Sequence, residues 1–123
     1  MNRKHFVYLL ILYAALMLIV HLLRGARFPI DNIIGMDKFL HFTEYVIFAF
    51  LFINAIKAPN LAKIFLIIII GTTFGALIEF LQCYVAGRYA SVYDAIANTA
   101  GMITGSFLSY KYLIISDDKK SVH

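Results

Sequence analysis

Four long apolar blocks, separated by short stretches of charged and helix-breaking residues, make up most of the chain. They cover residues 6–23, 38–56, 64–85 and 93–113. A membrane-spanning helix needs roughly 20 mostly apolar residues to cross about 30 Å of hydrocarbon, and each block comes close to that length. The pattern therefore predicts an all-α fold, a polytopic membrane protein built as a four-transmembrane-helix bundle, with one domain over residues 1–123.

The first block could belong either to a cleaved signal peptide or to a retained helix. Arg3 and Lys4 precede it, as a signal peptide requires, but the apolar run is longer than a signal core and does not end in small residues. Arg24 and Arg27 follow it as charged anchors. We therefore expect a retained membrane helix.

Composition supports the membrane interpretation. Of the 123 residues, 62% are hydrophobic and 15% are charged, and the mean hydropathy is +0.81. Soluble domains average about 45–50% apolar and about 25% charged residues. This composition excludes a soluble globular domain and a disordered tail. Because Cys83 is the single cysteine, an internal disulfide scaffold is excluded as well.

The net charge of +4 does not indicate nucleic-acid binding. The basic residues are scattered between apolar blocks instead of forming one basic face, which suits anchors at helix ends. Cytoplasmic segments carry an excess of Lys and Arg, and that rule favours both termini on the cytoplasmic side. The inside segments would hold Arg3, Lys4, Lys57, Lys63, Lys111, Lys119 and Lys120, and the outside segments Arg24, Arg27, Lys38 and Arg88.

Polar residues concentrate toward one end of three predicted helices and in the connection before the last one. They are Asp37, Lys38, His41, Glu44, Tyr45, Glu79, Gln82, Arg88, Asp94 and Asn98. With cytoplasmic termini, all of them converge near the outer face. An ionised side chain inside a bilayer costs from about 2.5 kcal/mol upward unless it is paired or hydrated. Such a layer is therefore a candidate functional site.

The charges of this layer do not balance. If His41 is counted as neutral, the four carboxylates of the layer exceed its two cations, Lys38 and Arg88, by two negative charges. Either a carboxyl is protonated, or His41 is charged, or a cation is missing from the count.

Two pairs of glycines stand four residues apart, Gly71 with Gly75 and Gly101 with Gly105. This spacing lets membrane helices approach closely. We expect the glycines to hold the last two helices against their neighbours and to turn the polar layer toward the interior.

An ordered set of motifs links these residues. It reads Asp37-Lys38-x-x-His41-Phe42-x-x-Tyr45, then Glu79-x-x-Gln82, then Gly87-Arg88-x-x-Ser91-x-x-Asp94-x-x-x-Asn98-x-x-Gly101-x-x-x-Gly105. At these residues the sequence resembles the VanZ-like family of bacterial integral membrane proteins. Ala86 stands where the family often has proline. The resemblance implies a multi-pass protein of the bacterial cytoplasmic (inner) membrane with a role at the cell envelope, in a family whose name-giver is linked to glycopeptide (teicoplanin-type) resistance.

Three interpretations of the polar layer remain open. In the first, Arg27, Lys38 and Arg88 hold the phosphate or carboxylate of an envelope lipid or cell-wall precursor, while acids and amides bind its hydroxyl or amine groups. In the second, Glu79 or Glu44 acts as a general acid or base beside His41, and we take His41 and Glu79 as the catalytic pair. In the third, the layer is a structural network. We favour binding, because polar contacts in membranes average under about 1 kcal/mol each.

Other roles find less support in the sequence. A metal held by His41 with Glu44, Glu79 or Asp94 lacks any ligand-spacing signature, so we predict neither a metal nor a cofactor. Ser91 has the spacing of a helix cap, and His21 is expected near the outer end of the first helix without a role. Membrane lipids are the expected partners. A homo-oligomer is a further possible partner. Transport would require one, because four helices in a single copy form too thin a wall around a pathway.

Overall fold

The computed structural model describes residues 2–23, 35–56, 59–85 and 89–121, and within these ranges all regular structure is helical. The four helices are α1 (Arg3–Leu23), α2 (Met36–Ala55), α3 (Leu61–Val85) and α4 (Val92–Ser121). The all-α prediction is confirmed.

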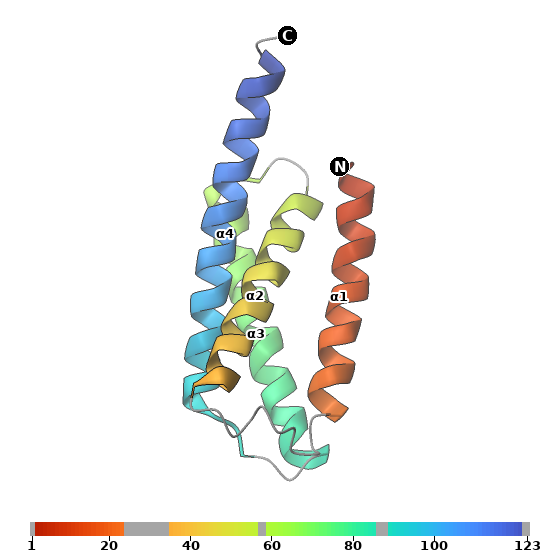
Figure 1. Ribbon diagram of the computed structural model, residues 1–123, viewed down its shortest axis with the longest axis vertical. Helices are drawn as coiled ribbons and strands as arrows, with labels where there is room; N and C mark the ends of the chain where they lie inside the picture. The colour runs from red at the N-terminus through yellow and green to blue at the C-terminus, as the bar shows by residue number, and fades with distance from the viewer. Residues whose placement is uncertain (1, 24–34, 57–58, 86–88, 122–123) are drawn as a thin grey trace.

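The helices run alternately up and down, so α1 begins and α4 ends at the same end of the bundle (Figure 1). Helix α2 lies in the middle and packs against α1, α3 and α4, and its contact with α4 is the most extensive. Consequently the end of α1, the start of α2, the end of α3 and the start of α4 share the opposite end of the bundle. Four segments far apart in sequence are thereby brought to one level.

Two glycines explain why α2 and α4 lie so close. A Cβ atom on Gly101 would overlap the carbonyl oxygen of Phe42, and one on Gly105 would overlap the carbonyl oxygen of Val46. The α4 backbone therefore lies directly on the α2 backbone. On α3, the Cβ position of Gly71 is filled instead by the end of the Met102 side chain.

The interior combines an apolar core with a polar end. The buried core holds Met17, Tyr45, Phe48, Ala49, Ile53, Ile67 and Met102. Phe48 stacks on Phe74 with ring centroids 5.5 Å apart and meets Phe52 edge-on at 5.8 Å. Large apolar side chains cover the outside of the bundle, among them Tyr8, Ile11, Leu12, Phe39, Phe65, Leu66, Ile103 and Phe107. A surface that is apolar all round suits lipid surroundings.

Among the residues that the structure describes, two segments are long and apolar enough to cross a membrane: Arg3–Leu23, with a mean hydropathy of 2.6, and Leu61–Tyr84, with 2.4. These are α1 and most of α3. Helices α2 and α4 carry most of the polar residues named above. Crossing of the membrane by α2 and α4 therefore stays a prediction.

The observed helices differ from the expected ranges mainly at their ends. Helices α1 to α3 begin two or three residues earlier than predicted. Helix α4 continues to Ser121, so the expected end near residue 113 was wrong. The segment from Lys111 onward contains neither glycine nor proline, and nothing in it interrupts the backbone hydrogen bonds of the helix.

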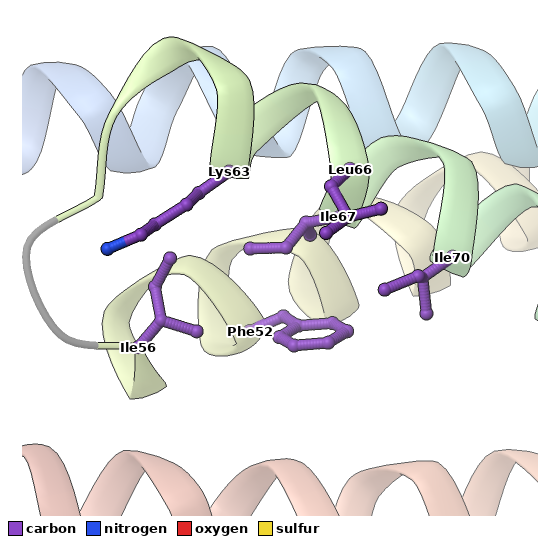
Figure 2. A pocket seen from close by; sticks show the side chains of 6 residues that line it. All are labelled: Phe52, Ile56, Lys63, Leu66, Ile67 and Ile70. Carbon is purple, nitrogen blue, oxygen red and sulfur yellow. The ribbon is translucent and has the colours of Figure 1, made fainter.

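A shallow apolar groove of about 370 Å³ lies between α2 and α3 at the end where α1 begins (Figure 2). Its lining residues are Phe52, Ile56, Lys63, Leu66, Ile67 and Ile70. The Lys63 side chain extends along the edge of the groove toward the end of α2. The space between α2 and α3 at this end is therefore lined mainly by apolar side chains, in contrast to the opposite end of the bundle.

Candidate polar site at one end of the bundle

At the end opposite the groove, all four helices contribute polar side chains to one cluster. We call it the polar cluster; its described members are His21, Asp37, Lys38, His41, Glu44, Glu79, Gln82, Asp94 and Asn98. Six of them are buried, namely His21, His41, Glu79, Gln82, Asp94 and Asn98. Burial of so many polar groups in a chain of this size requires mutual hydrogen bonds and ion pairs.

Lys38 joins the start of α2 to the start of α4. Its ammonium donates to Asp37 Oδ2 at 2.9 Å and to Asp94 Oδ1. The Lys38 side chain is 40% exposed, whereas that of Asp94 is 3% exposed. Lys38 therefore closes the cluster from the outside, with its charge reachable from that side.

His41 lies at the centre of the cluster. Its Nδ1 atom is 3.0 Å from Asn98 Oδ1. An amide oxygen only accepts hydrogen bonds, so Nδ1–H is the donor. The same nitrogen is 3.8 Å from Glu79 Oε1. On the other side of the ring, Nε2 is 3.7 Å from Asp37 Oδ1 and 3.8 Å from Asp94 Oδ2.

His21, from the last turn of α1, completes the cluster, and the expectation that it has no part in the layer was wrong. Gln82 Nε2 donates to His21 Nδ1 at 3.2 Å and to the His21 carbonyl at 2.8 Å. His21 Nδ1 is thus the acceptor, and Nε2–H donates to Glu44 Oε2 at 2.7 Å. The His21 and His41 rings lie 5.1 Å apart.

The signal that could have identified His21 is its position. It is the one polar side chain in the second half of an otherwise apolar helix, at the level where the other polar residues converge. A polar group at a helix end is commonly assigned to the membrane interface, where it needs no partner. Here it is buried instead.

Tyr45 lies beneath the polar cluster as part of the core, and its side chain is buried. A Cβ atom on Gly75 would stand 2.7 Å from the Tyr45 hydroxyl oxygen and 2.9 Å from Asn98 Nδ2. Gly75 thus leaves the space that these two side chains fill. Tyr13 Oη, from α1, donates to the Glu44 carbonyl at 3.1 Å.

The other residues singled out in the sequence are the arginines of the connections and the predicted helix cap Ser91. Arg88, like Arg24 and Arg27, lies outside the described residues. Ser91 Oγ accepts a 3.4 Å hydrogen bond from the Asp94 backbone N–H, as a helix cap does. The Asp94 carboxylate does not complete a capping box at Ser91, because it binds Lys38 on α2.

Among the described members of the cluster, four carboxylates face one ammonium and two imidazoles. Two sets of three ligand atoms come within 4.8 Å of one another, one from His21, His41 and Glu44 and the other from Asp37, His41 and Asp94. The cluster can therefore bind hydroxyl and amine groups through its acids and amides, an anion at Lys38, or a cation between its carboxylates.

An apolar exterior around a buried polar cluster is typical of helical membrane proteins. In such proteins the buried polar groups pair with one another or bind a ligand. The VanZ/LLP1 family model matches residues 2–115. The chain belongs to the VanZ/LLP1 family, which confirms the resemblance seen in its motifs. No curated protein and no solved structure matches it.

Proposed function

We propose that the protein crosses the bacterial inner membrane four times with both termini in the cytoplasm. We also propose that its polar cluster recognises an envelope lipid or cell-wall precursor at the outer face. One observation carries the proposal: six buried polar side chains from all four helices, four of them ionisable, meet at a single end of a bundle whose core is otherwise mainly apolar.

The packing of α2 and α4 supports four spans. His41 on α2 and Asp94 and Asn98 on α4 are buried in the bundle, while Phe39 and Ile47 on α2 and Ile103 and Phe107 on α4 are exposed. A helix that turns its polar side inward and its apolar side outward can lie in lipid although its overall hydropathy is moderate. The greater number of basic residues at the other end favours a cytoplasmic location for that end.

Lys38 indicates the chemistry of the ligand. It is the exposed cation of a cluster whose other members are mostly buried, and an ammonium binds phosphate or carboxylate as a point charge. The neighbouring carboxylates accept hydrogen bonds from hydroxyl or amine groups. A headgroup that combines a phosphate with hydroxyl or amine groups therefore suits the outer side of the cluster.

Binding fits the geometry better than acid–base catalysis at His41 and Glu79. Both side chains are buried, and His41 Nδ1–H is already engaged by Asn98. A general acid or base must reach the proton that it transfers. A purely structural role is disfavoured because interhelical polar contacts in membranes average about 0.6 kcal/mol, well below the cost of inserting the charges.

The proposal is tested by lipid binding to the purified protein in a mild detergent, followed by native mass spectrometry. We expect phosphatidylglycerol to be retained by the wild type and its retention to fall about tenfold in Lys38→Met. Lys63→Met, which removes a cation at the opposite end, serves as the matched control and should keep wild-type retention. Equal retention by both variants would refute the role of Lys38.

Family membership links the chain to glycopeptide resistance, which provides a cellular assay. Expression of the wild type in a sensitive strain should lower its sensitivity to teicoplanin, and Lys38→Met should abolish the effect at equal protein level. If Lys38→Met protects as well as the wild type does, the polar cluster is not the functional site.

A further inference from the structure

Three ligand atoms from α2 and α4 lie within 4.8 Å of one another in the polar cluster. They are His41 Nε2, Asp37 Oδ1 and Asp94 Oδ2, and the nitrogen lies 3.7 and 3.8 Å from the two oxygens. Both separations are too long for hydrogen bonds. His41 and Asp94 are buried, so bulk water does not separate these groups freely.

The hydrogen bond from His41 to Asn98 determines what Nε2 presents to the two carboxylates. When the ring is neutral, this hydrogen bond keeps its one proton on Nδ1 and leaves the lone pair on Nε2. A cation placed among Nε2 and the two carboxylate oxygens would be attracted by all three atoms. Metal-binding histidines show the same arrangement, with one nitrogen toward the metal and the other donating to an oxygen that fixes the ring.

We propose that Asp37, His41 and Asp94 form a binding site for a divalent transition-metal cation, with Zn²⁺ and Mn²⁺ as the best-matched ions. Two ligand atoms about 2.1 Å from a cation and at a tetrahedral angle lie roughly 3.4 Å apart. The two separations from Nε2 exceed this value by a few tenths of an ångström, and the two carboxylate oxygens lie within 4.8 Å of each other, so side-chain movements would be needed to complete the site.

Lys38 does not occupy the same position as the cation. Its ammonium binds Asp37 Oδ2 and Asp94 Oδ1, whereas the other oxygen of each carboxylate faces His41. Lys38 thus holds the two carboxylates from the outside with their second oxygens directed inward.

The second set of ligand atoms, from His21, His41 and Glu44, fits a cation less well. His21 Nε2 and Glu44 Oε2 are 2.7 Å apart, which is hydrogen-bond distance and leaves no room for an ion between them. His21 Nδ1 is occupied by Gln82. Both nitrogens of His21 are therefore already engaged.

The choice of ion follows from the donor set. One imidazole and two carboxylates suit Zn²⁺ and Mn²⁺, because imidazole favours the former and carboxylates accept the latter. Three protein ligands leave further coordination positions for water or a ligand. The proposed lipid recognition is not needed for this site, since the metal alone is the probe.

The test measures metal binding to the full chain in detergent, purified through a tag that lacks histidine. After removal of adventitious metal with a chelator, incubation with Zn²⁺ or Mn²⁺ and dialysis against metal-free buffer, we expect one bound ion per chain by elemental analysis. Co²⁺ should give the visible absorption of a low-coordinate nitrogen–oxygen site. Asp94→Asn and Asp37→Asn should abolish stoichiometric binding, and Asn98→Ala, which leaves the ligands in place, should weaken it about 10- to 100-fold.

Glu44→Gln distinguishes the two ligand sets, because it removes a carboxylate from the other set alone. Retention of one metal per chain in Glu44→Gln, with loss in Asp37→Asn, is the expected result. Asp37 is the more exposed ligand, so its variant decides the matter if Asp94→Asn does not fold. The proposal is overturned if the wild type binds no Zn²⁺ or Mn²⁺, or if Asp37→Asn binds as well as the wild type.

Discussion

Two glycines at close helix contacts, Gly105 on α4 and Gly71 on α3, are predicted to tolerate substitution by alanine very differently. In Gly105→Ala, the new methyl group would overlap the carbonyl oxygen of Val46 and lie 2.9 Å from the Ala49 Cβ atom. Both obstacles are fixed to the α2 backbone, so relief requires the two helices to move apart. In Gly71→Ala, the obstacle is the end of the Met102 side chain, which can adopt another rotamer.

The magnitude follows from two opposing terms. Overpacking a tight contact costs roughly 1–3 kcal/mol, and alanine in place of glycine regains up to about 1 kcal/mol of helix propensity. Because the Val46 oxygen cannot move away by itself, Gly105→Ala belongs at the upper end and should lose about 2 kcal/mol net. Gly71→Ala, with a flexible neighbour, should change the stability by less than about 0.5 kcal/mol.

Thermal unfolding followed by circular dichroism in one mild detergent measures both variants. At roughly 4 °C per kcal/mol, Gly105→Ala should lower the Tm by about 8 °C, and Gly71→Ala by no more than about 2 °C. A Tm for Gly105→Ala within 2 °C of the wild type would refute the close backbone contact. A large loss in Gly71→Ala as well would mean that Met102 is not free to move.

Two further predictions concern the hydrogen bonds of the polar cluster. Asn98→Ala removes the acceptor of the buried His41 Nδ1–H, and its thermal unfolding should show a loss of about 1–3 kcal/mol; an unchanged Tm would contradict the hydrogen bond. His21 and Glu44, 2.7 Å apart, should be coupled by at least about 0.6 kcal/mol in a double-mutant cycle of His21→Ala and Glu44→Ala. Strictly additive losses would show that the pair is not bonded.

The convergence of the polar residues at one end of the bundle could be predicted from the sequence, because two strong physical constraints determine where polar residues can lie in a membrane helix. Apolar length set the number and alternation of the helices, and the cost of charges in lipid required groups such as Glu79 and Asp94 to face inward. Helices that alternate in direction then bring the end of one to the level of the start of the next. These arguments need only positions along the chain.

The partners within the cluster could not be predicted in the same way. Whether Asp94 caps its own helix or binds Lys38 depends on the distance between α2 and α4, which local sequence does not specify. His21 was missed because one polar residue near a helix end carries no periodic signal. Its burial depends on Gln82 and Glu44, which come from two other helices.

The close approach of α2 and α4 connects the packing of the bundle to the chemistry of its end. Asp94, Asn98, Gly101 and Gly105 follow one another at intervals of three or four residues, so they share one face of α4. The glycines of that face bring the α4 backbone onto α2. The polar residues of the same face thereby come within reach of the Lys38 ammonium and of His41 Nδ1. A wider helix spacing would leave the buried Asp94 carboxylate beyond reach of the Lys38 ammonium, and an unpaired buried charge is strongly destabilising. The glycine contact and the polar cluster therefore depend on each other, and the chain keeps both on a single helix face.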